Sequence, residues 1–158
     1  MRQPRSAVTS NVIIRTAIAA ERKALEAFQL RASLTNEGDR EALLANPDAI
    51  VIPSEQLVAG RVFVAELSGT TVGFSAIEPR ADGAMELDAL FVDPNVRRHG
   101  VGRLMVEHCA AVARKARSKA LHVIGNPHAR EFYLACGFEQ NGTIDTRFGV
   151  GLLMRREL

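Results

Sequence analysis

The strongest constraint on the fold is the segment LFVDPNVRRHGVGRLMVEHCAAVARKA, which covers residues 90–116. A short apolar run ends before Pro94, two arginines and two closely spaced glycines follow, and a helical pattern begins at Val101. The first turn of a helix presents free N–H groups and roughly half a positive charge. Glycines let a bulky anion approach the backbone, and arginines donate hydrogen bonds of matching geometry. The segment therefore predicts a phosphate site, and a diphosphate fits it best.

Two other nucleotide-binding motifs are absent from this segment. It contains neither the GxxxxGK[ST] pattern of a P-loop nor the GxGxxG pattern of a dinucleotide-binding fold. The residues alone leave one other interpretation open, a tight turn whose arginines are simply solvated.

Hydrophobic periodicity predicts an α/β domain with a mixed sheet around this segment. Strands are expected at 12–16, 61–67, 71–78, 84–92, 120–125, 138–144 and 149–155. Helices are expected at 19–33, 40–46, 101–116 and 126–136. The stretch 47–60 is ambiguous, because it places an extended apolar piece between two prolines. We expect residues 1–11 to form a flexible tail and residues 12–158 to form a single domain, since no repeat or linker interrupts them.

Composition excludes several classes of function. The net charge is only +2, with seven Phe, one Tyr and no Trp, so the chain lacks the basic stripe with interleaved aromatics of a nucleic-acid binder. No apolar run approaches the ~20 residues that span a bilayer. Cys109 and Cys136 lie far apart, and the four histidines show no metal-ligand spacing. We expect a cytoplasmic protein that has reduced thiols, binds no metal, and has no nucleic-acid or membrane partner.

The glycine-rich segment resembles the acetyl-CoA site of the GNAT superfamily, the Gcn5-related N-acetyltransferases. That family carries the signature [RQ]-x-x-G-x-[GA] after a strand, and Arg97, Gly100 and Gly102 fill it. The order of the expected elements also agrees with the family over residues 12–155. The resemblance implies the GNAT acyl-CoA acyltransferase fold: a mixed, mostly antiparallel central sheet of six to seven strands, flanked by four helices.

A second segment supports the same resemblance. Asn126, a helix that contains Tyr133, and the pair Gly137-Phe138 match the family's N…Y…GF pattern. Two segments in the correct order are far more specific than either one alone. The resemblance implies an acetyltransferase with acetyl-CoA as co-substrate and no metal.

The resemblance also implies which residues hold the cofactor. The backbone of Leu90, Phe91 and Val92 would pair with the pantetheine arm like an added strand. The diphosphate would be held by backbone and side-chain donors of the loop and first helical turn: Arg97, Arg98, His99, Gly100, Val101, Gly102 and Arg103. Asn126 would contact the cofactor near the pantetheine, and it can also serve as an ordinary N-cap before Pro127.

Three side chains are candidates for the chemistry. The acceptor amine must be neutral, and a lysine-type amine with a pKa of about 10.4 costs about 4 kcal/mol to deprotonate at pH 7.4. Glu86 is the candidate base, and Asp88, two positions along the same strand, is its competitor. Water could replace both, leaving them as solvent-facing carboxylates. Tyr133 occupies the family's general-acid position, with core packing as the alternative. A backbone N–H from residues 91–92 could stabilise the oxyanion.

The resemblance thus implies an N-acetyltransferase that moves the acetyl group directly to a primary amine of a small molecule or a protein in a ternary complex. A non-catalytic acyl-CoA-binding sensor or interaction module is the alternative. It would keep Arg97, Gly100, Gly102 and Asn126 but would not need Tyr133 or the two carboxylates. A domain without any cofactor would require both motif segments to be coincidental. Nothing in the sequence identifies the acceptor, and a homodimer is implied only by family habit.

Overall fold

Seven strands pair in one hydrogen-bonded sheet. The computed structural model describes residues 11–35, 37–46, 48–97 and 99–158. The strands are β1 (Val12–Thr16), β2 (Val62–Leu67), β3 (Thr70–Pro79), β4 (Met85–Val92), β5 (Ala120–Gly125), β6 (Glu139–Thr146) and β7 (Gly149–Glu157). Their order in the sheet is β1-β2-β3-β4-β5-β7-β6. Strands β4 and β5 run parallel, whereas β1–β2, β2–β3, β5–β7 and β6–β7 are antiparallel, which confirms the expected mixed, mostly antiparallel sheet.

The described residues contain five α-helices, one more than predicted. They are α2 (Arg22–Ser33), α3 (Glu37–Ala45), α4 (Ser54–Val58), α5 (Val101–Lys115) and α6 (Arg130–Ala135). Three short 3₁₀ helices accompany them: η1 (Ala19–Glu21), η2 (Pro94–Val96) and η3 (Pro127–Ala129). The additional helix, α4, lies in the ambiguous stretch, where Pro53 precedes its first residue and Leu57 is buried. None of the helices in these described ranges is long and apolar enough to cross a membrane.

The chain divides into two compact units, and each is described by itself below. Among the described residues, the first unit comprises those of 11–76 and 89–105. The second comprises Ile77–Asp88 and Val106–Leu158. The prediction of a single domain over residues 12–158 stays a prediction.

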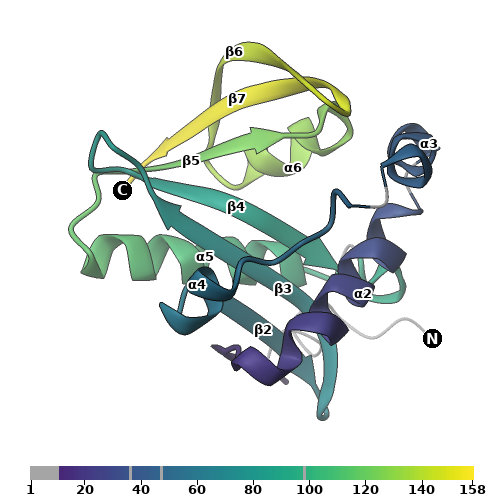
Figure 1. Ribbon diagram of the computed structural model, residues 1–158. Helices are drawn as coiled ribbons and strands as arrows, with labels where there is room; N and C mark the ends of the chain where they lie inside the picture. The colour runs from purple at the N-terminus through teal and green to yellow at the C-terminus, as the bar shows by residue number, and fades with distance from the viewer. Residues whose placement is uncertain (1–10, 36, 47, 98) are drawn as a thin grey trace. The chain divides into compact units, whose positions relative to one another are not determined.

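The core of the first unit forms where α2 packs on the sheet (Figure 1). Leu25 and Phe28 are the buried face of α2, because their spacing places both on one side of a helix. Phe28 meets Phe74 of β3 edge-on, with ring centroids 6.1 Å apart. Phe74 in turn stacks on Phe91 of β4 at 5.4 Å. Three aromatic rings therefore connect α2 to the final residues of β4.

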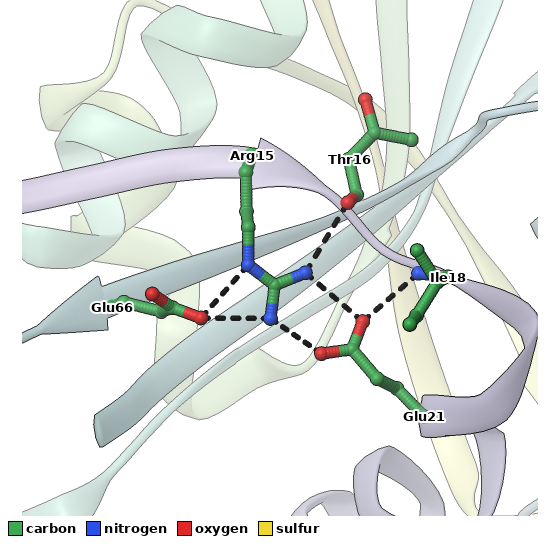
Figure 2. Close-up of polar contacts among 5 residues, drawn as sticks. All are labelled: Arg15, Thr16, Ile18, Glu21 and Glu66. Carbon is green, nitrogen blue, oxygen red and sulfur yellow. Dashed lines mark hydrogen bonds and ion pairs between the residues drawn. The ribbon is translucent and has the colours of Figure 1, made fainter. Parts of the chain in front are cut away.

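An ion-pair network fixes the beginning of the first unit (Figure 2). Arg15 on β1 donates to Glu66 on β2 through Nε at 2.8 Å, and to Glu21 in η1 through Nη1 at 3.0 Å. Its Nη2 contacts both carboxylates as well. The backbone N–H of Ile18 also donates to Glu21, at 2.9 Å. The hydrogen bond from Arg15 is the main cause that lowers the pKa of Glu21, so this carboxylate stays charged in the folded state.

The second unit contains β5, α6 and the β6–β7 hairpin. The hairpin comes after α6 in the chain and is coloured yellow in Figure 1. Leu121 and Val123 of β5 are buried and pair with Met85 and Leu87 of β4, so these four side chains share one face. On α5, the Glu107 carboxylate accepts a hydrogen bond from Arg156 Nη1 of β7 at 2.7 Å. This hydrogen bond connects α5 to β7 within the second unit.

Candidate functional site

The predicted diphosphate loop lies entirely within the first unit. Strand β4 ends at Val92, and the Asp93 N–H donates to the carbonyl of Val72 on β3 at 2.8 Å. The Asp93 carboxylate then accepts from the Asn95 N–H at 2.8 Å and caps η2. These two bonds anchor the loop at the point where it leaves the sheet.

Gly100 turns the loop into α5. Its φ angle is +84°, in the left-handed region that glycine adopts without strain. The first helical hydrogen bond runs from the Leu104 N–H to the Gly100 carbonyl at 3.0 Å. The N–H groups of Val101, Gly102 and Arg103 precede that bond, so they have no acceptor within the helix. Because α5 is 15 residues long, its dipole adds positive potential at this end.

Two side chains of the loop differ in their contacts. The Nδ1 atom of His99 is buried and has no hydrogen-bond partner among the residues that the structure describes. Arg97 instead points its guanidinium at α2, where Nη2 donates to the carbonyl of Ala32 at 3.2 Å. Arg98 lies outside the described residues. A buried ring nitrogen without a partner, followed in the chain by N–H groups that have no acceptor within the helix, fits an anionic ligand.

The predicted pantetheine strand is the second half of β4. Leu90, Phe91 and Val92 are each partly buried. Leu90 and Val92 pack against the apolar cluster that contains Val101 of α5, whereas Phe91 belongs to the aromatic stack under α2. The parallel pairing between β4 and β5 ends at Leu87, although β4 itself continues to Val92.

Glu86, the candidate base, lies in a charged cluster of the second unit. Its carboxylate accepts a hydrogen bond from Arg80 Nη1 at 2.7 Å. Arg80 is also paired with Asp82 at 3.2 Å. The bond to Glu86 is the main cause that raises the pKa of Arg80, and the Ala84 N–H is the main cause that lowers the pKa of Asp82. One carboxylate oxygen of Glu86 is therefore already bonded to Arg80 in the protein without substrate.

His122 lies directly opposite Glu86 in the β4–β5 register. Burial lowers the pKa of His122, and the nearby cations Arg80 and Arg155 lower it further, against the opposite effect of Asp82 and Glu86. The imidazole is therefore neutral at physiological pH. Arg155 is the register partner of His122 on β7, so the cluster extends over three strands.

The other two catalytic candidates have contrasting environments. Asp88 is exposed, two positions after Glu86 on β4. Tyr133 is only 7% exposed, and its ring meets Phe132 and Phe138 at 5.1 and 5.4 Å. Burial raises the pKa of Tyr133, with the buried thiols of two cysteines, Cys136 and Cys109, adding to the effect. The phenol stays protonated across the physiological range.

Gly125 explains how the Tyr133 ring is accommodated. A Cβ atom at position 125 would lie 3.2 Å from the ring, closer than ordinary packing allows. Next to it, the Asn126 side chain accepts from the His128 N–H at 2.9 Å and caps η3. Its predicted capping role is confirmed, and its contact with a cofactor stays a prediction.

Sequence reasoning missed the charged neighbours of Glu86. Arg80 and Asp82 lie in the turn between β3 and β4, and the spacing of Arg80 and Glu86 across this hairpin was the available signal. His122 gave no local signal, because only the parallel register places it beside Glu86. Within the described ranges, no three His, Cys, Asp or Glu side chains come together as metal ligands.

Comparison with known proteins places these features in a family. The chain is 41% identical over 56 residues to peptidyl-lysine N-acetyltransferase YjaB of Escherichia coli, covering 35% of this chain and 37% of that protein. It is 31% identical over 93 residues to an uncharacterised N-acetyltransferase of Methanocaldococcus jannaschii, covering 52% of this chain and 40% of that protein. The chain thus spans well under half the length of these curated relatives.

Solved structures share the fold at low sequence identity. The PaiA N-acetyltransferase of Thermoplasma acidophilum, solved in complex with coenzyme A, superposes with a TM-score of 0.74 at 15% identity, covering 93% of this chain and 99% of that one. The profile of the acetyltransferase (GNAT) domain family matches residues 59–140, which is 82 of the 158 residues. This chain therefore belongs to the acetyltransferase (GNAT) domain family.

Proposed function

We propose that this protein is an acetyl-CoA-dependent N-acetyltransferase that transfers the acetyl group directly to a primary amine in a ternary complex. One observation carries the proposal: Gly100, at a φ of +84°, leads into three N–H groups at the start of α5 that have no acceptor within the helix, and His99, whose buried Nδ1 has no partner among the described residues, precedes Gly100. This arrangement suits a diphosphate. Membership in the GNAT family supplies the expectation that this diphosphate belongs to coenzyme A.

The residues proposed to hold the cofactor act mainly through their backbone. Leu90, Phe91 and Val92 would pair with the pantetheine arm, since the pairing of β4 with β5 has ended before them. Acetyl-CoA supplies an activated thioester, so the protein has only to position the amine, move its proton and stabilise the departing sulfur. The Phe91 or Val92 N–H is the proposed donor to the developing oxyanion.

Tyr133 is proposed to act on the sulfur as a hydrogen-bond donor. Its raised pKa keeps the phenol protonated, as a donor requires. Full proton transfer to a thiolate is uphill, because an ordinary thiol has a pKa of about 8.5 and an ordinary phenol about 10. The phenol would therefore stabilise the departing sulfur by hydrogen bonding while charge develops, and solvent would complete the protonation.

Removal of the amine proton is proposed to involve Glu86, with Asp88 or water as the competing base. Glu86 has the better-defined position, because Arg80 holds its carboxylate at 2.7 Å. The same contact occupies one carboxylate oxygen, so the proton would pass to the other oxygen or through a water. Asp88 is more exposed to solvent than Glu86.

The acceptor is proposed to be a primary amine of a small molecule or of a protein or peptide. One relative is a peptidyl-lysine N-acetyltransferase, which favours an amine on a protein side chain as the first acceptor to test. The carboxylates of Glu86 and Asp88 on one strand would attract an ammonium group before it loses its proton.

Calorimetric titration with acetyl-CoA tests the proposal, followed by a panel of amines read by free-thiol release. We expect micromolar binding that the double variant Arg97→Ala, Gly100→Trp abolishes. A Gly69→Ala variant is the matched control, since Gly69 also has a positive φ of 78° but lies in the β2–β3 turn. If folded wild-type protein shows no heat of binding, the function proposed here is wrong.

A second candidate is a non-catalytic acyl-CoA-binding module, favoured by the Arg80–Glu86 ion pair that engages the proposed base. Such a module would bind acetyl-CoA as tightly as the enzyme but release no thiol with any amine in the panel. Enzymatic turnover that falls with Glu86→Gln would exclude this candidate.

A further inference from the structure

The contact between Arg97 and α2 assigns this arginine a role that its sequence position does not suggest. Arg97 lies in the loop proposed to bind the diphosphate, yet its Nη2 atom donates to the Ala32 carbonyl at 3.2 Å. Ala32 is 3% exposed and belongs to the last turn of α2. Both residues are in the first unit, so the contact is internal to one compact body.

The chemistry of the α2 C-terminus suits an arginine. The last carbonyls of a helix lack N–H partners and carry partial negative charge, so a cation there is favoured. The Ala32 carbonyl accepts a second hydrogen bond from Thr35 Oγ1 at 2.7 Å. One donor therefore comes from the chain just after the helix, and the other comes from the glycine-rich loop, 65 residues away.

A second, apolar connection runs in parallel with this polar one. Phe28 of α2, Phe74 of β3 and Phe91 of β4 are in contact, with centroid distances of 6.1 and 5.4 Å. Phe91 lies six positions before Arg97, so α2 contacts the cofactor segment both on its strand and in its loop. The aromatic contacts and the Arg97 bond therefore both connect α2 to this segment.

We infer that Arg97 is a positioning residue, which joins the glycine-rich loop to the end of α2, and that it is not a direct ligand of the cofactor phosphates. Nη2 of the guanidinium is directed to the helix end, so the anion would be bound by the N–H groups at the start of α5 and by His99. The part of this inference that concerns acetyl-CoA rests on the proposed function. The link between Arg97 and α2 does not.

The two roles of Arg97 make different demands on the side chain. A donor to a backbone carbonyl needs an N–H group and does not need charge, so glutamine can replace it. A phosphate ligand needs the positive charge, and its loss reduces the salt dependence of binding. The variants Arg97→Gln and Arg97→Ala therefore separate the roles.

The first arm of the experiment measures amide hydrogen exchange of residues 30–35 in the protein without cofactor. We expect Arg97→Ala to accelerate exchange at the end of α2 about tenfold, because a charged hydrogen bond to its last turn is lost. Arg97→Gln should restore most of the protection. Thr35→Val is the matched control, since it removes the other donor to the same carbonyl and leaves the loop untouched. Unchanged exchange in Arg97→Ala would overturn the inference.

The second arm measures acetyl-CoA affinity at several salt concentrations. We expect Arg97→Gln to bind within about threefold of wild type and to keep the wild-type slope of log Kd against log salt, because a phosphate contact changes that slope by about one. A slope reduced by about one in Arg97→Gln would show a direct phosphate contact and overturn the inference. If wild type binds no acetyl-CoA, the proposed function fails, while the exchange arm still decides whether Arg97 holds α2.

Discussion

The candidate functional residues of the two compact units differ in kind. In the first unit, the candidate features of the glycine-rich loop belong to the backbone: a positive φ at Gly100 and N–H groups at the start of α5. In the second unit, the candidate residues act through side chains: Glu86 in an ion pair with Arg80, and Tyr133 buried between phenylalanines. Binding by backbone N–H groups should tolerate most side-chain substitutions except those of the glycine. Catalysis by side chains should depend on the residues that surround each reactive group.

The largest expected effect is on the backbone site. Gly100→Val forces a β-branched residue to a φ of +84° and closes the approach to the helix start, so acetyl-CoA affinity should fall by about 100-fold, or ~2.7 kcal/mol. Titration calorimetry measures the loss. Gly69→Val, at a φ of +78° in an open turn, should lose similar folding stability and keep its affinity. Equal losses of affinity in both variants would show that strain alone explains the result.

Glu86→Gln tests whether the second unit depends on a charged side chain. The variant removes the proton acceptor but keeps the shape of the side chain, so kcat/KM should fall by about 100-fold, with acetyl-CoA affinity unchanged. Steady-state kinetics over a pH series make the measurement, and Asp88→Asn serves as the matched variant. A full rate in Glu86→Gln with a reduced rate in Asp88→Asn would transfer the role to Asp88.

Tyr133→Phe removes a single hydroxyl from a packed ring. Because the phenol acts as a hydrogen-bond donor and not as a full acid, kcat should fall by about 10–100-fold, at the low end of acid–base effects. The melting temperature should change little, since the ring contacts with Phe132 and Phe138 remain. An unchanged kcat would leave Tyr133 with a packing role only.

Glu21→Gln gives a smaller effect, on stability and its dependence on pH. The folded state lowers the pKa of Glu21, so the stabilisation is fully present above the unfolded value of about 4.5 and is lost as the pH falls through the lower folded value. Urea denaturation at pH 7 should show wild type more stable by about 1 kcal/mol, given the partial solvent screening of this network. The difference between the two proteins should shrink below about pH 4. A difference that does not depend on pH would contradict the assignment.

The smallest expected effect comes from His122. Its pKa is lower in the folded protein than the ordinary value of about 6.5, so the unfolded chain binds the proton first and folding stability declines as the pH falls below about 6.5. His122→Gln should remove that part of the decline, by less than about 1 kcal/mol between pH 7 and pH 5. Denaturation curves at these two pH values make the comparison. An identical decline in both proteins would assign it to other groups.

Short elements show where sequence reasoning reached its limit. The strands expected at 61–67 and 71–78 are present as β2 and β3, and Ser68 and Gly69 between them adopt the positive φ angles that a two-residue turn requires. Helix α4 was not predicted, since Ser54–Val58 is too short for helical periodicity to emerge. It is stabilised by burial of Leu57 in the core of the first unit, which no local pattern records.

Neighbouring residues alone were enough to predict the strand before Pro94, the glycine-rich turn and the long helix, because backbone conformation and helix-end chemistry depend on residues within a few positions of one another. Together with the family resemblance, the sequence also suggested Glu86, Asp88 and Tyr133 as the polar groups to test. The contacts of the charged side chains came from the folded structure. Arg97 donates to the carbonyl of Ala32, 65 residues away, and the parallel register of β4 and β5 places His122 opposite Glu86. Contacts of that kind depend on how distant segments pack, so the partners of a charge emerge only once the chain has folded.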